Sequence, residues 1–515
     1  PGHSYPAKVD GPGRPTGKWS ILREKTKLRP HAKSETAGQK VIMKKRRSFQ
    51  GDRKRTNALP TAAEPGAAGR QYSRRDNRAN ERPETSSRDR DRDPTAPSNS
   101  QMIRQRTELS PSASQSIPAV MMNRSTLHPL LYRKRLTKIE DARPGDLVAV
   151  MAEDRIVGYG VYNPRSEIAV RVLWNTDVFP TDEDWMRKLR DADQLRRGTL
   201  KLAESTNAWR LIHSESDGLS GLVVDQFADV LSAEAFGLGM YQRTQLLMPR
   251  LCEITGAKHW MVRTSPQFVS QEGCDPPPLS SANCPSQVVI QEFGTRFRVR
   301  FEGGHKTGFF CDQRENRRRL ADFCEGASVL DLCCYTGGFS VQASVLGKAS
   351  EVIGVDLDEE PLKVARENAN LNQARVRFVQ ADAFSYMRDM IRNGRLFDVV
   401  VLDPPKLIRT RMEIEEGTRR HYALNRLAMQ LVRPGGLLLT CSCAGLLQES
   451  EFLNLLYAAV RNSNQSEDTD GSTRSSSTPP RTARIIARSG AAPDHPVISN
   501  CPETDYLKAV WMIMD

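Results

Sequence analysis

The sequence predicts an α/β protein whose Rossmann-like domain is preceded by a small β-barrel and an α+β module. Two patterns carry this prediction. Apolar strands alternate with helix-like stretches after residue 327, as in a doubly wound parallel sheet. Before that, short strands follow one another at roughly ten-residue spacing with Gly and Pro turns, which is typical of a small barrel. We expect four parts, with the boundaries 1–126, 127–203, 204–302 and 303–515.

The first part, residues 1–126, is expected to be a disordered basic tail. Residues 1–130 hold 27 Lys and Arg against 12 Asp and Glu, and the first 120 residues show no sustained hydrophobic period. Such a segment buries too little apolar surface to offset the entropy of its chain. Its charge fits two interpretations equally well, a salt-sensitive contact with nucleic acid or a dispensable tail.

The second part, residues 127–203, is expected to hold the β-barrel and a linker helix. A charged helix is predicted from Thr181 to about Lys201, and the α+β module that follows contains the strand-turn-strand pattern Arg210–Asp225. The strands of the barrel are predicted within the ranges Lys138–Met151, Arg155–Pro164 and Ile168–Leu173.

Composition excludes several classes of protein. No apolar run reaches the ~20 residues of a membrane span, and no signal-peptide core is visible. The ten cysteines include no Cys-x-x-Cys pair and no zinc-ligand grouping, which is typical of a reducing compartment and predicts no metal. We therefore expect a cytoplasmic protein without a membrane partner. An organelle is the alternative location, and a homodimer is left open.

The Rossmann-like domain contains the distinctive segment Asp331–Phe339. The apolar residues 327–330 predict a strand, Thr336-Gly337-Gly338 predicts a tight turn, and a helix follows. Glycines let the backbone come close to a nucleoside at the carboxyl end of such a strand. On its own this turn is a weak signal.

Three later strands end in carboxylates at the spacing of βαβ units. Asp356 is placed to accept the hydroxyl groups of a ribose, Asp382 to accept the amine of an adenine, and Asp403 ends a buried strand before two prolines. The chain has neither a Gly-x-Gly-x-x-Gly nor a Gly-Lys-Ser/Thr phosphate loop. The pattern therefore favours a nucleoside cofactor without a polyphosphate, S-adenosylmethionine (AdoMet). The alternative is an ordinary doubly wound domain with acidic strand ends.

Several longer motifs occur in order along residues 128–515, namely Tyr162–Pro164, Glu215–Leu219, Gly304–Asn316, Asp331–Phe339, Asp403–Lys406, Thr440–Gly445, Asp494–Val497 and Pro502–Lys508. Together they resemble the large-subunit ribosomal RNA (rRNA) cytosine-C5 methyltransferase family that carries a PUA domain. The resemblance implies an RNA-binding PUA barrel, a central α+β module and a class I AdoMet-dependent methyltransferase domain. It also implies AdoMet as cofactor and large-subunit rRNA as partner.

Methylation of carbon 5 of a cytosine requires a thiolate, an acid and a base. Carbon 5 is a poor nucleophile until a thiolate adds to carbon 6, and the carbon-5 proton must leave afterwards. Asp403 is placed to bond the N3/N4 edge of the ring. Cys441 and Cys443 face the same side of the next strand because they differ by two positions. The resemblance favours Cys443 as the nucleophile; a small buried hydrophobe is the alternative for each thiol.

Further residues are expected to act as the base and as binding groups. Glu503 precedes the final strand and could return to the pocket as the base, with a surface carboxylate as the equal alternative. Asp494-His495 is a candidate for orienting the active-site loop. The expected AdoMet-binding residues are Asp331, Tyr335, Gly337, Gly338, Asp356, Asp382 and Gln313, and the expected RNA-binding residues are Lys306, Arg314 and Lys406.

Other functions fit parts of the same pattern. Asp-Pro-Pro motifs also serve methyltransferases that act on a base nitrogen, which needs no thiol, and methylation of uracil carbon 5 would use the same thiol chemistry. A PUA module with a degenerate cofactor domain would instead be a non-catalytic assembly factor. The intact glycine turn and strand-end carboxylates disfavour that alternative.

Overall fold

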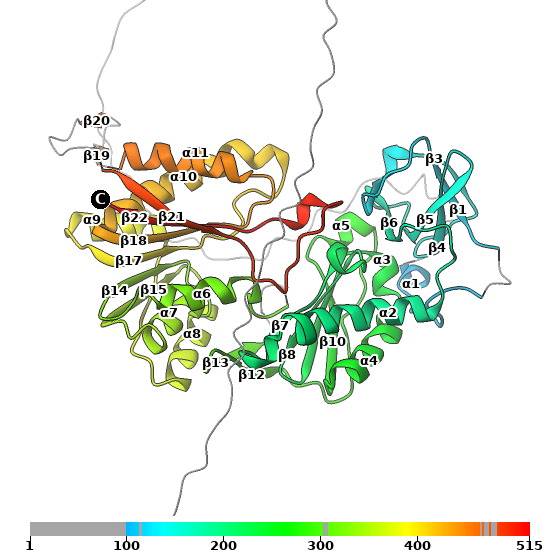
Figure 1. The fold of residues 1–515 in the computed structure, drawn as a ribbon, viewed down its shortest axis with the longest axis horizontal. Helices are drawn as coiled ribbons and strands as arrows, with labels where there is room; N and C mark the ends of the chain where they lie inside the picture. The colour runs from blue at the N-terminus through cyan, green and yellow to red at the C-terminus, as the bar shows by residue number, and fades with distance from the viewer. Residues whose placement is uncertain (1–98, 113–115, 302–306, 464–465, 468–472, 475–480) are drawn as a thin grey trace, which may run out of the picture. The chain divides into compact units, whose positions relative to one another are not determined.

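The computed structural model describes residues 99–112, 116–301, 307–463, 466–467, 473–474 and 481–515 (Figure 1). These ranges all belong to one unit, Asp89–Asp515. Most of the expected tail lies outside them, as does Lys306. Among the helices of the described ranges, none combines the length and the apolar character that crossing a membrane requires.

Regular structure begins before residue 127, which corrects the expected end of the basic tail. A short helix, α1 (Asn99–Met102), precedes strand β1 (Ala119–Met122). Strand β1 pairs in parallel with β4 (Leu147–Ala152) and antiparallel with β3 (Leu136–Glu140), and Val120 is fully buried there. Because β1 is only four residues long in a polar region, its strand structure depends on these pairings and not on local composition.

The first sheet has six strands in the order β2-β6-β5-β4-β1-β3, and it contains the three strand ranges expected from the sequence. Gly158 and Gly160 allow neighbouring strands to approach, since a Cβ there would lie 2.6 and 2.5 Å from backbone carbonyl oxygens. The other elements are β2 (Leu130–Tyr132), η1 (Arg133–Arg135), β5 (Arg155–Tyr162) and β6 (Ile168–Trp174).

A linker helix leads from this sheet to the central module. Helix α2 (Asp182–Asp193) begins at a capping box between Thr181 and Asp184 and continues into a π-helical turn, η2 (Gln194–Thr199). The module is a five-stranded sheet in the order β11-β10-β9-β8-β7. Its elements are η3 (Leu202–Glu204), β7 (Ala208–His213), η4 (Ser214–Asp217), β8 (Leu222–Phe227), β9 (Val230–Ala235), α3 (Leu238–Tyr241), α4 (Thr244–Thr255), β10 (His259–Thr264), α5 (Phe268–Glu272) and β11 (Leu279–Ser280).

A β-hairpin joins the central module to the last domain. Strands β12 (Gln287–Glu292) and β13 (Thr295–Arg300) pair antiparallel. Strand β13 packs on two helices of the last domain, α7 (Gly338–Val345) and α8 (Glu359–Leu371). Ile290 and Phe297 of the hairpin share one buried cluster with Val341 of α7. The hairpin therefore fixes the central module against the cofactor-side helices.

The last domain is the expected doubly wound domain. Its seven-stranded sheet has the order β16-β15-β14-β17-β18-β22-β21. Strands β14 to β18 are parallel, and β22 runs antiparallel between β18 and β21. Its elements are η5 (Cys311–Gln313), α6 (Arg314–Ala321), β14 (Ser328–Leu332), α7 (Gly338–Val345), β15 (Glu351–Asp356), α8 (Glu359–Leu371), β16 (Arg377–Gln380), α9 (Ala383–Arg392), β17 (Phe397–Leu402), η6 (Arg411–Glu413), α10 (Ile414–Leu431), β18 (Val432–Ser442), α11 (Glu449–Arg461), the short pair β19 (Ser466–Glu467) and β20 (Thr473–Arg474), β21 (Ala483–Ser489), η7 (Pro502–Thr504) and β22 (Lys508–Met514).

Helices cover both faces of this sheet (Figure 1). On one face Leu330 packs with Met387 of α9 and residues of α10 and α11, while on the other Val329 packs with Leu320 of α6 and Ala343 of α7. Neighbouring residues of a strand point to opposite faces, so β14 is buried on both sides. Such a sheet offers a ligand the carboxyl ends of its strands.

Candidate active site

The carboxyl ends of five parallel strands bring the predicted site residues to one edge of the sheet. Asp356 is the last residue of β15, Asp403 follows β17, and Cys443 follows β18. Leu402 is aligned with Thr440 in the parallel β17–β18 pair, so Asp403 and Cys441 occupy the next register position. These strand-end residues therefore lie at the same carboxyl edge of the sheet.

The turn after β14 has an unusual backbone. Cys333, Tyr335 and Gly337 have φ angles of 62°, 50° and 77°, all in the left-handed region. Such a conformation costs a non-glycine residue on the order of 1–3 kcal/mol and persists where the surroundings fix it. Here the Tyr335 N–H donates to Asp356 Oδ2 at 2.8 Å, which ties the turn to β15. The Tyr335 ring meets Phe310 edge-on at a centroid distance of 5.0 Å.

Packing within the protein disfavours a side chain at both glycines of the turn. A Cβ on Gly337 would lie 3.0 Å from Phe378 Cζ, and a Cβ on Gly338 would lie 3.1 Å from Arg317 Cδ. Glycine at these two positions is therefore explained by the limited space beside the turn and by the positive φ of Gly337. Close approach to a cofactor through these backbones stays a prediction.

Asp331 lies beneath the turn and is fully buried. Its Oδ2 accepts hydrogen bonds from the Ser340 backbone N–H at 3.0 Å and from Ser340 Oγ at 2.6 Å, which fixes the start of α7. Its Oδ1 is buried and has no hydrogen-bond partner among the described residues. Burial, helped by the carboxylates of Asp403 and Asp356, raises the pKa of Asp331 to about 7 against the bonds from Ser340. An unpartnered buried acceptor at this position fits a cationic amine such as that of AdoMet.

Asp356 and Asp382 are oriented by backbone groups. Asp356 Oδ1 accepts from the Asp358 N–H at 3.0 Å, so both of its oxygens are held at the edge of the sheet. Asp382 is exposed and caps α9, because its Oδ1 accepts from the N–H and Oγ of Ser385 at 2.9 and 3.1 Å. Capping is thus a sufficient structural reason for Asp382, and its contact with adenine stays a prediction.

Gln313 contacts Asp403, and its contact with the methionine end of AdoMet stays a prediction. The buried amide donates from Nε2 to Asp403 Oδ2 at 3.1 Å. Its Oε1 accepts from Asn316 Nδ2 at 2.6 Å, and Ser489 Oγ donates to Asn316 Oδ1 at 2.8 Å. This chain of bonds fixes which end of the Gln313 amide faces Asp403, so Gln313 orients that carboxylate.

The two competing cysteines of β18 differ in environment. Cys441 is fully buried, and burial raises its pKa well above the ordinary thiol value. Cys443 is half-buried beyond the end of the strand. A cavity of about 580 Å³ lies beside the loop that follows, lined by Gly445, Leu447, Gln448, Glu449, Arg488, Ser489, Gly490, Asp505, Leu507 and Lys508.

Arg314 does not face RNA, so this expectation is wrong. Its side chain is fully buried, and its two terminal nitrogens each lie 3.0 Å from an oxygen of Asp494, which is equally buried. Asp494 Oδ2 also accepts from the Arg210 backbone N–H at 2.8 Å. Asp494 therefore joins α6 to strand β7 of the central module and explains the Asp-His motif structurally. Lys406 is exposed after the two prolines, and Lys306 lies outside the described residues.

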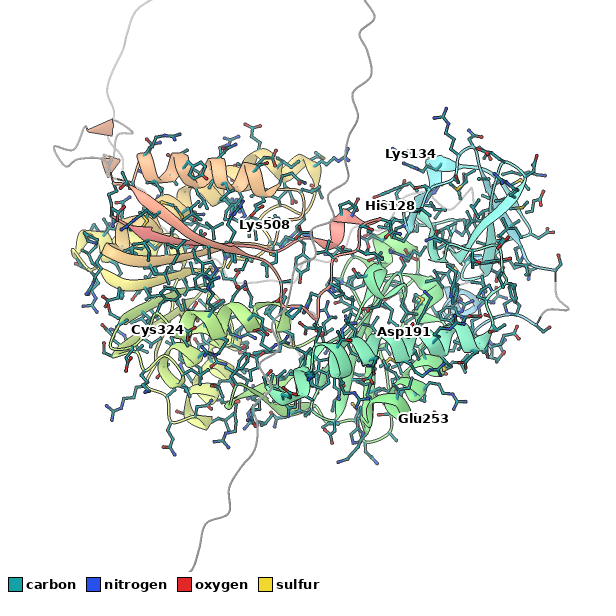
Figure 2. The ribbon with its side chains drawn as sticks, in the orientation of Figure 1. His128, Lys134, Asp191, Glu253, Cys324 and Lys508 are labelled. Carbon is teal, nitrogen blue, oxygen red and sulfur yellow. The ribbon has the colours of Figure 1, made fainter. Side chains whose placement is uncertain are left out.

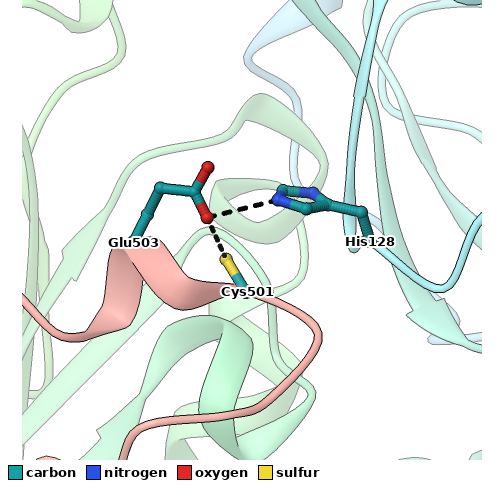
Figure 3. A group of neighbouring side chains, drawn as sticks. All are labelled: His128, Cys501 and Glu503. Atoms are coloured by element: carbon teal, nitrogen blue, oxygen red, sulfur yellow. Dashed lines mark hydrogen bonds and ion pairs between the residues drawn. The ribbon is translucent and has the colours of Figure 1, made fainter. Parts of the chain in front are cut away.

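Glu503 contacts His128, which precedes strand β2, and its exposed side chain fits the surface carboxylate that was the equal alternative to a base. Its Oε2 lies 3.2 Å from His128 Nε2 and 3.5 Å from Cys501 Sγ, and its side chain is 64 % exposed (Figure 3). Burial opposes ionisation, but the hydrogen bonds to its carboxylate and the nearby His128 lower the pKa of Glu503. A carboxylate with a lowered pKa is a weaker base.

The same three side chains have the composition of a metal site, since their ligand atoms lie within 4.8 Å of one another. A metal would need an unprotonated His128 Nε2 and a Cys501 thiolate. However, His128 Nδ1 accepts from the Leu130 N–H at 3.1 Å, which leaves the hydrogen on Nε2 facing Glu503. Burial, with Glu215 and Glu503 nearby, also raises the pKa of Cys501 to about 12. The group is therefore a hydrogen-bonded contact between the first sheet and the last domain.

Comparison with known proteins agrees with this architecture. A family model described as a PUA-like domain matches residues 125–175, and one described as S-adenosylmethionine-dependent methyltransferase matches residues 211–461. Ribosomal RNA large subunit methyltransferase I of Photobacterium profundum is 33% identical over 394 residues, covering 74% of this chain and 94% of that protein. The protein of the same name from Aeromonas hydrophila is 34% identical over 398 residues with the same coverage. The chain belongs to the ribosomal RNA large subunit methyltransferase I family.

Solved structures share the fold of this family member. A putative SAM-dependent methyltransferase from Streptococcus mutans aligns with a TM-score of 0.62 at 18% identity, covering 77% of this chain and 100% of that one. SMU.776, a putative methyltransferase complexed with SAH, aligns with a TM-score of 0.63 at 18% identity and the same coverage. The expected PUA-like domain, the class I methyltransferase fold and AdoMet as cofactor are thereby confirmed.

Sequence reasoning missed Lys508, which lies beside the predicted nucleophile. The residue is buried at the start of β22, and its Nζ donates to the Ala444 carbonyl oxygen at 2.6 Å. A lysine that begins the apolar run Ala509–Met514 was the available signal, because lysine is rarely buried without a reason.

Proposed function

We propose that this protein transfers the methyl group of AdoMet to carbon 5 of a cytosine in large-subunit rRNA through a covalent adduct with Cys443. The observation that carries the proposal is the pairing of two strand ends. Asp403 and Cys443 follow the adjacent parallel strands β17 and β18, at the edge where a class I methyltransferase binds its ligands. The names of the relatives support large-subunit rRNA as the substrate.

AdoMet supplies an electrophilic methyl group on a sulfonium. The residues that would hold it surround the turn after β14. The unpartnered Oδ1 of Asp331 suits the cationic amine, and Asp356, fixed by two backbone N–H groups, suits the ribose hydroxyls. Tyr335 and Asp382 complete the set of proposed contacts.

The Cys443 thiolate begins the reaction by adding to carbon 6 of the cytosine. The electron pair of the C5–C6 double bond shifts to the C4–C5 bond and that of the C4–N3 bond to N3, where Asp403 stabilises the N3/N4 edge by hydrogen bonding. Carbon 5 becomes enamine-like and would displace the methyl group from the sulfonium, whose sulfur would keep the bonding electron pair and leave as a neutral thioether. Loss of the carbon-5 proton to a base restores the double bond and expels the thiolate. Gln313 supports this sequence by fixing Asp403 from the side.

One experiment separates this proposal from its rivals. Full-length protein is incubated with labelled AdoMet and unmodified large-subunit rRNA, and the labelled nucleoside is identified. The proposal predicts 5-methylcytidine. Label on a base nitrogen would favour the alternative that Asp-Pro-Pro motifs support, and 5-methyluridine would move the acceptor to uracil. AdoMet binding without label in any rRNA would remove large-subunit rRNA as the substrate.

A further inference from the structure

Lys508 is placed directly beside the proposed nucleophile. It is the first residue of β22 (Figure 2), and it is aligned with Ser442, the residue before Cys443. Its Nζ donates to the carbonyl oxygen of Ala444, the residue after Cys443, at 2.6 Å. The ammonium thus contacts the backbone on one side of Cys443 while its own strand pairs with the other side.

The ammonium of Lys508 is incompletely paired. An ammonium group carries three N–H donors, and burying it costs free energy unless they are satisfied. Lys508 is 8 % exposed, and the Ala444 carbonyl is the only hydrogen-bond acceptor it has among the described residues. Asp505 and Glu449 are the carboxylates that act on Lys508, and within the same ranges neither forms an ion pair with it, since Glu449 pairs with Arg488 instead. The site therefore favours an additional anion close to Cys443.

Titratable groups of several neighbouring elements interact with Lys508, including the buried His421 of α10, whose pKa is lowered by burial and by the charge of Lys508. Burial lowers the pKa of Lys508, whereas Asp505 and Cys443 raise it. Lys406, from the loop after β17, lowers the pKa further, and Glu449 at the start of α11 raises it. The neighbouring Tyr506 donates to Asp312 Oδ2 at 2.6 Å, and burial raises its pKa well above the ordinary value, so it stays uncharged.

We propose that Lys508 is an activating residue that holds Cys443 as a thiolate through its positive charge. The inference rests on the proposed function for its catalytic meaning. An ordinary thiol is only a few per cent ionised at neutral pH, so a nucleophilic cysteine needs a neighbouring cation or base. Lys508 forms no covalent bond: the thiol proton leaves to solvent before the reaction, and the expelled thiolate returns to the same ammonium.

The test measures the reactivity of Cys443 in the full chain without AdoMet or RNA. Iodoacetamide reacts with the thiolate and releases iodide, and the alkylated peptides are quantified by mass spectrometry between about pH 6 and 10. Lys508→Met removes the charge at similar length, and Lys508→Arg keeps it. Cys252, which is half-buried in the central module, is the internal reference in every digest.

We expect Lys508→Met to slow alkylation of Cys443 at neutral pH about tenfold and to move its pH profile upward. Lys508→Arg should stay within about threefold of the wild type, and Cys252 should not change. If the pH profile of Cys443 alkylation is unchanged in Lys508→Met, the proposal is overturned. This holds even if the variant binds RNA less tightly, because weaker RNA binding does not show that Lys508 activates the thiol. If Lys508→Met does not fold, the wild-type profile decides, because a midpoint at or above that of an ordinary thiol contradicts an activating cation.

This measurement is independent of methyl transfer. A shifted alkylation profile together with label on a base nitrogen would leave the Lys508–Cys443 pair standing and reject the proposed function. An unshifted profile together with 5-methylcytidine as product would keep the function and reject the role of Lys508.

Discussion

The two halves of the active-site edge are built in different ways. At the ends of β14 and β15, side chains are fixed by nearby backbone groups, as when Asp356 accepts from Tyr335 and Asp358. At the ends of β17 and β18, they are fixed by side chains from distant segments. Gln313 holds Asp403, and Lys508 reaches the loop after Cys443. The cofactor half, at the ends of β14 and β15, therefore rests on contacts between successive strands of the chain. The thiol half, at the ends of β17 and β18, depends on segments that are 90 and 64 residues away in the sequence.

The largest expected effect is on methyl transfer, which should be lost on replacing Cys443 but kept on replacing Cys441. Cys443→Ala should reduce methyl transfer to rRNA by about a thousandfold or more, because the nucleophile is lost. Cys441→Ala removes a buried thiol and should keep activity within a few-fold, with a stability cost of about 1 kcal/mol. Labelled methyl incorporation at saturating substrates checks both. Equal activity in the two variants would contradict the assignment.

The buried ion pair between Arg314 and Asp494 should contribute strongly to the free energy of unfolding. Asp494→Asn leaves Arg314 buried without its anion, which should cost about 3–5 kcal/mol. Asp229→Asn, which breaks the exposed pair with Lys258, is the matched control and should cost less than about 1 kcal/mol. Urea unfolding of the full chain measures both changes. A cost for Asp494→Asn no larger than that of the control would show that the buried pair is not an anchor.

In the cofactor half, the buried carboxyl group of Asp331 should make the stability of the protein depend on pH. The pKa of Asp331 is raised to about 7 by burial, above the ~3.9 of an unfolded chain. Between these values the folded protein binds the proton more tightly, so the stability of the apo-protein should fall as pH rises from about 4 to 7. Asp331→Asn should lose this slope. Thermal unfolding across this range checks it, and equal slopes in both proteins would contradict the burial argument.

The smallest effect concerns Glu503. Because its carboxylate bonds His128 and its pKa is lowered, Glu503→Gln should keep the rate constant of methyl transfer within about threefold. Cys443→Ala, measured in parallel, gives the scale of a lost catalytic group. A loss of a hundredfold or more in Glu503→Gln would restore it as the base.

The same difference between local pattern and distant contacts decided what the sequence could predict. The alternating strands, the glycine turn and the strand-end carboxylates follow from local pattern and parallel topology, so the fold and the positions of Asp356 and Asp403 were predictable. Arg314 was misjudged because a polar residue in a polar run looks exposed, whereas its burial depends on Asp494, far along the chain. The partner of Glu503, His128, is equally distant in the sequence. Strand β1 was missed for the same reason, since its pairing partners make it a strand.

The most direct test of the account is to trap the covalent intermediate. Large-subunit rRNA that contains 5-fluorocytidine carries fluorine in place of the carbon-5 proton, so the final elimination step is blocked. With AdoMet present, we expect a denaturation-resistant protein–RNA adduct whose cross-linked peptide contains Cys443, and no adduct with Cys443→Ala. Methyl transfer to rRNA without any such adduct, or an adduct on another residue, would contradict carbon-5 methylation through Cys443.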